Sequence, residues 1–245
     1  MDVGAIFLLV LSGFVLLVLL ILRGRKGPAP QVRPLPAFQD LWGETGVAAE
    51  SGGAIHIALG SGGLSGDDAV TSLAGLQVLE SLADAAVSYP PPIVTVGDPT
   101  LLPLAQDTLR RAYERNGLAA LYNPGRVRFV APSPVAYAAG AAHVVATENI
   151  TASTMYGAFG AEVSLITDAG ARRDLPQLAA AAAPLALGAL YPAIDRLAVG
   201  EELYAAGAQM TGERRYLVSL VAQDVLRVVL VLVILGAAGL ALLSS

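Results

Sequence analysis

Residues 3–22 contain no charged side chain, and this run constrains the chain more than any other feature. At about 1.5 Å per residue, a helix of this length spans roughly 30 Å, the thickness of the hydrocarbon core of a bilayer. A cleaved signal peptide fits less well, because the run is preceded by acidic Asp2 and followed by Arg23-Gly24-Arg25-Lys26, which offers no small-residue cleavage site. The run therefore predicts an uncleaved transmembrane helix.

A second candidate span lies at residues 217–243. Its most apolar part is VVLVLVILGAAGLALL at 228–243, and residues 217–221 extend it towards the length of a full span. Basic residues follow the first span and precede the second: Arg23, Arg25, Lys26, Arg33, Arg214, Arg215 and Arg227. The positive-inside rule places both flanks in the cytoplasm. We therefore expect a two-pass protein of the cell (inner) membrane, with a cytoplasmic domain and both termini outside.

Composition agrees with a membrane protein, since 14% of the residues are charged, against about 25% in a typical soluble domain. Residues 175–194 are also uncharged, but Pro176, Pro184 and Pro192 would each break backbone hydrogen bonds in a spanning helix. We interpret this third segment as a buried or membrane-abutting helical part of the domain.

The region between the two spans divides into a linker and a domain. Residues 23–53 are rich in proline and glycine and predict a semi-rigid linker.

Residues 54–216 predict an α/β domain with an alanine-rich helical C-terminal part. Short apolar runs predict strands at 54–59, 93–96, 127–131 and 162–167, and helical patterns cover 67–87, 98–115 and 134–147. In the first helix, apolar residues recur at three-residue steps: Val70, Leu73, Leu76, Leu79 and Leu82. Alternation of strands and helices indicates a Rossmann-like, mainly parallel sheet with flanking helices.

In such sheets ligands bind outside the carboxyl ends of the strands. The first strand-to-helix turn holds Gly60, Ser61, Gly62 and Gly63, a loose relative of the dinucleotide fingerprint. Asp98 follows the second strand and Ser133 the third, so these residues are the candidate ligand-binding positions. A nucleotide is the one cofactor that the turn suggests. We favour a plain structural turn over a nucleotide site, because Asp67 and Asp68 at the helix start would repel an anion and satisfy the cap themselves, and because capping also explains Asp98.

Few other residues suggest chemistry. The chain has no cysteine and two histidines, so we expect no metal site; His56 in a strand and His143 in a helix are interpreted as buried structural side chains. Glu201 and Glu202 form a candidate carboxylate pair, although acidic residues also suit the first turn of a helix. The net charge of −5 argues against nucleic-acid binding. We identify no catalytic residue.

Several segments carry a resemblance to a known family: IALGSGGLSG and SLAGLQVLE (57–66, 72–80), PPIVTVGDPTLLPLAQDTLRRAY (91–113), VRFVAPSPVAYAAG (127–140), VGEELYAAGA (199–208) and AQDVLR (222–227). With these segments the chain resembles a family of functionally uncharacterised prokaryotic membrane proteins. The resemblance implies terminal spans and a Rossmann-like core, and it implies no activity.

Two functional hypotheses follow from these features. The first is a non-enzymatic, membrane-anchored module that acts as a scaffold or ligand-sensing component and assembles with itself or with another membrane protein. The alternative is a membrane-bound enzyme that uses a nucleotide or nucleotide-sugar at the Gly60–Gly66 turn.

Overall fold

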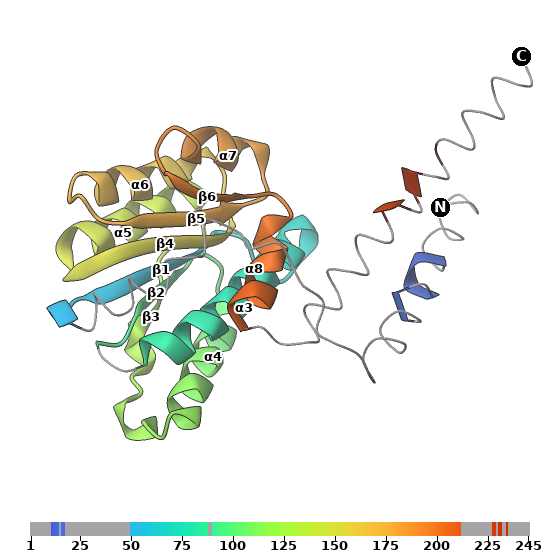
Figure 1. The fold of residues 1–245 in the computed structure, drawn as a ribbon. Coiled ribbons are helices and arrows are strands. Elements are labelled where there is room, and N and C mark those ends of the chain that lie inside the picture. The colour runs from blue at the N-terminus through green and yellow to red at the C-terminus, as the bar shows by residue number, and fades with distance from the viewer. Residues whose placement is uncertain are drawn as a thin grey trace, which may run out of the picture. The chain divides into compact units, whose positions relative to one another are not determined.

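A six-stranded parallel sheet is the centre of the domain (Figure 1). The computed structural model describes residues 11–14, 16, 17, 50–87, 90–211, 227, 228, 230, 231 and 234. The strands are β1 (Ala54–Gly60), β2 (Ile93–Val96), β3 (Val127–Phe129), β4 (Ile150–Ala158), β5 (Gln177–Ala181) and β6 (Arg196–Val199). The helices are α3 (Ala69–Ala86), α4 (Leu101–Arg115), α5 (Pro134–Thr147), α6 (Ser164–Ala171), α7 (Pro184–Leu190) and α8 (Glu202–Thr211).

The strand order is β3-β2-β1-β4-β5-β6, and every neighbouring pair is parallel. This is the order of doubly wound Rossmann folds, in which the direction of winding reverses between β1 and β4. Helices α3, α4 and α8 cover one face of the sheet, and α5, α6 and α7 cover the other (Figure 1). The sequence prediction of an α/β fold with a parallel sheet and flanking helices is therefore confirmed.

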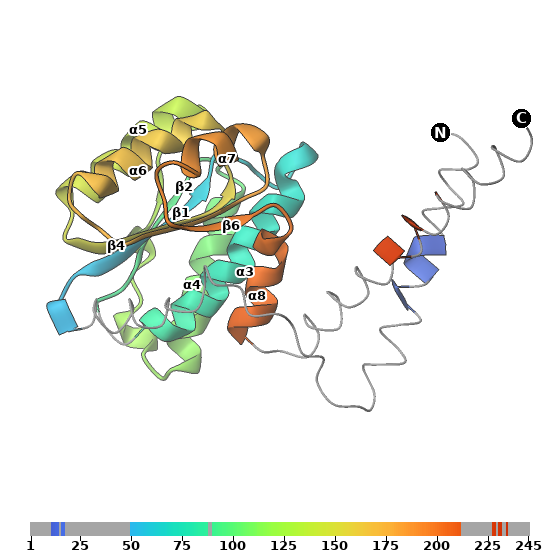
Figure 2. The same ribbon diagram turned by 45° about the horizontal axis from the view of Figure 1, so that its top comes forward.

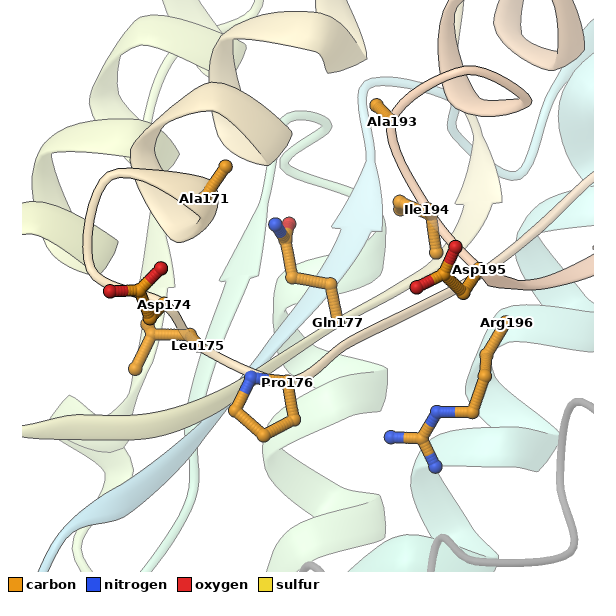
Figure 3. A pocket seen from close by; sticks show the side chains of 9 residues that line it. All are labelled: Ala171, Asp174, Leu175, Pro176, Gln177, Ala193, Ile194, Asp195 and Arg196. Atoms are coloured by element: carbon orange, nitrogen blue, oxygen red, sulfur yellow. The ribbon is translucent and has the colours of Figure 1, made fainter.

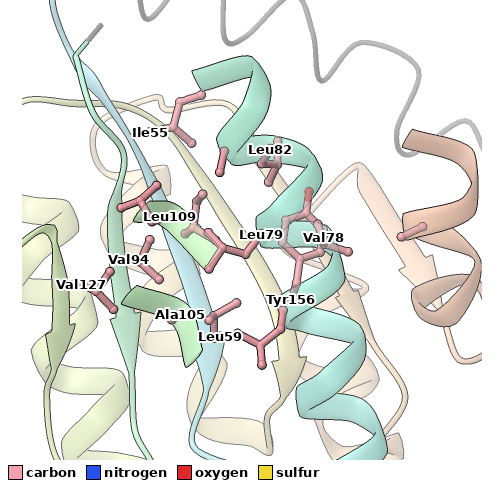
Figure 4. Close-up of a cluster of buried hydrophobic side chains, with 14 of the residues drawn as sticks. Ile55, Leu59, Val78, Leu79, Leu82, Val94, Ala105, Leu109, Val127 and Tyr156 are labelled. Carbon is pink, nitrogen blue, oxygen red and sulfur yellow. The ribbon is translucent and has the colours of Figure 1, made fainter. Parts of the chain in front are cut away.

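The core on the α3 side is built from large aliphatic side chains (Figure 4). Ile55, Ile57 and Leu59 of β1 alternate with side chains that face the opposite layer, as the two-residue period of a strand requires. Leu79 and Leu82 of α3 and Leu109 of α4 are fully buried against them.

The core on the α5 side contains many alanines. Ala58, Ala179 and Ala181 of the sheet pack with Ala138 and Ala141 of α5. Tyr137 and Phe159 are the buried aromatic members of this layer.

One strand prediction is wrong. Residues 162–167 instead cover most of a 3₁₀ turn (Ala161–Val163) and the start of α6. The Glu162 carboxylate accepts a hydrogen bond from the Gly160 N–H (2.8 Å) in the first turn, where an acidic side chain favours a helix start. The fourth strand is β4, at 150–158. The third strand ends at Phe129, two residues earlier than predicted.

Residues 175–194 are also not one helical segment. They contain β5 and α7, and β6 follows at residues that the sequence interpretation left without an element. The prolines mark the boundaries: Pro176 precedes β5, Pro184 begins α7 at a position where a missing N–H costs nothing, and Pro192 follows α7.

Two compact units divide the chain: residues 34–210, and a unit formed by 1–33 together with 211–245. In the terminal unit, the described residues of 11–17 and of 227–234 are helical. Most of both predicted spans, 3–22 and 217–243, and of the predicted linker, 23–53, lies outside the described residues. Within the part of the chain that is described, no helix is long and apolar enough to cross a membrane.

Candidate ligand site at the carboxyl edge of the sheet

The Gly60–Gly63 turn lies where β1 and β4 end side by side. After β1 the chain enters α3 on one face, and after β4 it enters α6 on the other, so the turn stands at the topological switch point of the sheet. The turn after β2, with Asp98, meets it at the same edge. Ser133 is exposed at the start of α5, beyond the end of β3, and its side chain makes no cap hydrogen bond. The structure thus brings two of the three predicted loops together.

Backbone groups of the glycine turn are bonded to three neighbouring elements. Ser61 N–H donates to Ala158 O (3.0 Å) at the end of β4. Gly97 N–H donates to Gly60 O (2.9 Å), which joins the turn to the end of β2. Gly60 N–H donates to the Tyr137 hydroxyl (3.2 Å) beneath the turn. These bonds use polar groups that would otherwise be available to a ligand.

Glycine is required in this turn because the protein's own side chains approach it closely. A Cβ at Gly62 would lie 2.5 Å from Ala158 Cβ and 2.8 Å from Asp68 Cβ. A Cβ at Gly63 would lie 2.5 Å from Cγ of Asp98. The space above these glycines is therefore filled by residues of the same chain.

Asp98 closes the turn that begins α4. Its carboxylate accepts from the Thr100 N–H (2.8 Å) and from the Thr100 hydroxyl, and the same hydroxyl accepts from the Leu64 N–H (3.2 Å). Thr100 therefore links the loop after β1 to the loop after β2. These contacts agree with the capping interpretation of Asp98, since a ribose would have to compete with Thr100 for the carboxylate.

The N-terminus of α3 differs from the expectation in one respect. Asp68 stands at the N-cap but makes no side-chain cap hydrogen bond, because its backbone already has helical dihedral angles. Asp67 and Asp68 are exposed, and they place negative charge where a pyrophosphate would bind. The Ser72 hydroxyl, fully buried one turn further on, has no hydrogen-bond partner among the described residues and lies 3.1 Å from the Cβ position at Gly62.

His56 belongs to a buried polar chain that ends at the glycine turn. Its Nδ1 lies 3.1 Å from Ser153 Oγ of β4, and its Nε2 lies 3.0 Å from Thr95 Oγ1 of β2. Thr95 Oγ1 is 3.2 Å from the Tyr137 hydroxyl, which receives the Gly60 N–H. Burial, with a smaller contribution from Arg128, lowers the pKa of His56 to about 3, so the imidazole is neutral at physiological pH. Burial likewise raises the pKa of Tyr137 to about 12.

The interpretation of His56 as a buried, bonded side chain is confirmed. That of His143 is wrong, because its side chain is exposed on α5. The predicted helix start is confirmed for Glu202, whose carboxylate accepts from the Val199 N–H (2.9 Å), while Glu201 is exposed beside it. Among the residues that the structure describes, no three His, Asp or Glu side chains are grouped closely enough to hold a metal ion.

A cavity of about 450 Å³ opens at the opposite edge, where β5 and β6 begin (Figure 3). It is lined by Ala171, Asp174, Leu175, Pro176, Gln177, Ala193, Ile194, Asp195 and Arg196. The Gln177 amide points into the space between the two loops, donates to Thr167 O (3.0 Å), and has a buried Oε1 without a partner in the described part of the chain. Sequence reasoning missed this cavity because its acidic residues come from two loops 21 positions apart, 174 and 195, around strands that were not recognised.

A family model described as "domain of unknown function (DUF6754)" matches residues 2–244, and the chain belongs to that family. No curated protein and no solved structure matches the chain.

Proposed function

We propose that this member of the family is a membrane-anchored module without catalysis of its own, which acts as a scaffold or ligand-sensing component of a membrane assembly. The observation that carries this proposal is the closed switch point. The N–H groups at this turn are already bonded: that of Gly60 donates to Tyr137, that of Ser61 to Ala158, and that of Leu64 to Thr100. The Asp98 carboxylate covers Gly63. A loop held in this way positions neighbouring surfaces and leaves little room for a substrate.

The membrane part of the proposal rests on the sequence. Residues 3–22 and 217–243 have the length and apolar character of spans, and their basic flanks favour a cytoplasmic domain in the cell (inner) membrane with both termini outside. A reporter fused after Ser245 tests this topology: an external reporter supports it, and a cytoplasmic reporter contradicts it.

The competing proposal is an enzyme that uses a nucleotide or nucleotide-sugar at the Gly60–Gly66 turn. Two observations favour it. The strand order places the turn where dinucleotides bind in doubly wound folds, and the Ser72 hydroxyl beside Gly62 has no partner among the described residues. Two observations argue against the enzyme. The carboxylates of Asp67, Asp68 and Asp98 surround the turn, and residues 34–109 contain no lysine or arginine that could bind a phosphate.

Native mass spectrometry of the gently solubilised full chain separates the two proposals. We expect a homo-oligomer or a complex with a membrane protein, free of nucleotide, and no shift of the melting temperature across a panel of nucleotides and nucleotide-sugars. A co-purified nucleotide that is lost in Ser72→Ala, and retained in Ser81→Ala, would contradict the scaffold role and establish a nucleotide site at the turn. Turnover of that nucleotide by the natural protein would then favour the enzyme over a ligand sensor. Ser81 is a matched control because it is also buried in α3 but donates to Gln77 O (3.1 Å), away from the turn.

A further inference from the structure

The apolar stripe of α3 does not remain on one face of the helix. A step of three residues turns an α-helix by about 300°, so each step falls about 60° behind a full turn. From Val70 to Leu79 the stripe therefore moves half-way round the helix. The structure shows the result: Val70 is 63% exposed and Leu73 49%, whereas Leu79 and Leu82 are fully buried. The first half of α3 thus carries apolar side chains into solvent.

These side chains form part of a defined surface, which we call the α3 patch: Leu64, Asp67, Asp68, Val70 and Leu73. All five are exposed. The patch lies between two neighbouring helices of the same face. Helix α4 packs against one side of α3, and α8 lies on the other, where the Thr71 hydroxyl is 3.2 Å from the Tyr204 hydroxyl (Figure 2). Exposed apolar side chains gathered in this way mark an interaction surface.

The charge around the α3 patch has one sign. Carboxylates follow the strands at this edge of the sheet: Asp67, Asp68, Asp98, Glu162, Glu201 and Glu202. The arginines of the domain lie towards the other edge of the sheet. Arg110, Arg111 and Arg115 are in the second half of α4, Arg126 and Arg128 are around the start of β3, Arg172 and Arg173 follow α6, and Arg196 begins β6. The sequence has the same asymmetry, because no lysine or arginine occurs between Arg33 and Arg110.

We propose that the α3 patch docks an amphipathic, basic helix of a partner protein, which deepens and rests on the proposed role as an interaction module. Apolar side chains of that helix would cover Val70 and Leu73, which stand at i, i+3 on α3 and present the ridge that a second helix needs. Its lysine or arginine side chains would meet Asp67 and Asp68. Charge complementarity of this kind selects the partner and speeds association.

Charge also selects against the other candidate occupants. A nucleotide or an anionic membrane surface carries the same sign as the patch and would be repelled. A two-fold contact with a second copy would place Asp67 and Asp68 of each copy against those of the other, since the same surface serves both partners. A basic protein helix is the occupant that satisfies both the apolar and the acidic residues.

The test uses the full chain in nanodiscs of zwitterionic lipid and a fluorescent amphipathic helical peptide of leucine and lysine. Its counterpart with glutamate in place of lysine serves as the peptide control. We expect the lysine peptide to bind and the glutamate peptide not to bind. Leu73→Gln weakens binding at least about tenfold, because an apolar anchor at the centre of a contact is lost. Leu121→Gln changes a leucine that is 58% exposed, in the turn after the C-terminal end of α4, and leaves binding unchanged.

The double variant Asp67→Asn, Asp68→Asn is expected to weaken binding and to flatten its dependence on salt concentration. Equal binding of the two peptides, an equal loss in Leu121→Gln, or a homo-oligomer that dissociates in Leu73→Gln would each overturn the proposal. A nucleotide that raises the melting temperature while the lysine peptide still binds would contradict the nucleotide-free scaffold of the proposed function and leave the docking surface. If the natural protein binds no lysine peptide, and no nucleotide shifts its melting temperature, the docking surface is contradicted and the proposed function stands.

Discussion

The hydroxyl of Tyr137 on α5 accepts a hydrogen bond from the Gly60 N–H at the end of β1, across 3.2 Å of fully buried space. The same hydroxyl donates to Thr95 O (3.2 Å) of β2, and the ring lies against Gly97, where an added Cβ would come within 3.0 Å of it. One side chain from the α5 layer therefore supports both loops of the candidate site. The geometry of the glycine turn depends on a residue 77 positions away in sequence.

Tyr137→Phe should lower the free energy of unfolding by about 1–3 kcal/mol, because it leaves the buried Gly60 N–H without an acceptor. Tyr113→Phe is the matched control: the Tyr113 hydroxyl is also buried but has no hydrogen-bond partner among the described residues, so its removal should cost almost nothing. Denaturant unfolding of the solubilised chain, followed by far-UV circular dichroism, measures both. Equal losses in the two variants would show that the bond to Gly60 does not support the turn.

His56 should make the domain sensitive to acid. Its pKa is about 3 in the folded state, mainly because burial disfavours the charged ring, and 6.5 is the ordinary value. Between these pH values the unfolded chain binds a proton that the folded chain does not, so stability falls as the pH is lowered through this window, by about 1.4 kcal/mol per pH unit. Above about pH 6.5 neither state binds the proton and the contribution is constant.

The pH dependence is best measured as a difference between variants, since carboxylates also titrate in this range. His56→Gln keeps a neutral polar side chain between Ser153 and Thr95 and should have a shallower slope of unfolding free energy against pH than the natural protein. His143→Gln should retain the natural slope, because the His143 side chain is in solvent. A slope that His56→Gln leaves unaltered would mean that the ring takes up its proton without unfolding.

The same buried chain explains why part of the fold was hidden from sequence reasoning. Strand β4 reads ITASTMYGA, and its hydroxyl-bearing residues leave it without a continuous apolar run. In the structure Ser153 Oγ meets His56, and Thr154 Oγ1 donates to His56 O (3.0 Å), so these polar groups are satisfied inside the sheet. The run Ile93–Val96 was recognised because its residues are β-branched throughout, which is typical of strands.

Candidate site residues were predictable to the extent that they reflect local chemistry. The glycines after β1 and the Asp98 turn stand out in sequence because close approach and capping leave a local signature. Neither the support from Tyr137 nor the cavity around Asp174 and Asp195 has one, because each depends on segments that the sheet brings together. The three-residue step of the α3 stripe was visible, and its geometric consequence follows from the helix pitch alone.

Gly75 should resist substitution although it lies within a helix. A Cβ there would stand 2.7 Å from Tyr156 O of β4, so Gly75→Ala must move α3 away from the sheet at a cost of about 1–3 kcal/mol. The Cβ of Gly188→Ala in α7 meets no atom of the described part of the chain within 4 Å. This variant should instead stabilise by about 0.5–1 kcal/mol, since alanine loses less backbone entropy in a helix. Thermal unfolding should place the two variants on opposite sides of the natural protein. Destabilisation by both would contradict the close packing of α3 on β4.

Two adjacent arginines should differ sharply in their contribution to stability. The Arg173 guanidinium donates to Val145 O, Glu148 O (2.9 Å) and Ile150 O (3.5 Å), so it binds carbonyl groups at the C-terminal end of α5 and at the start of β4. A cation at this position satisfies carbonyls that lack a partner within the helix and interacts favourably with its dipole.

Arg172 pairs with Asp168 (2.8 Å) one turn back on α6, where both side chains are largely in water. Arg173→Met should therefore lower the free energy of unfolding by about 1–3 kcal/mol, while Arg172→Met leaves the denaturant midpoint unchanged, because exposed ion pairs contribute little. Hydrogen exchange of the α5 amides gives a second measurement: protection near Val145 should fall in the first variant alone, and a uniform loss across the sheet would show that Arg173 acts on the whole domain and not on the end of α5.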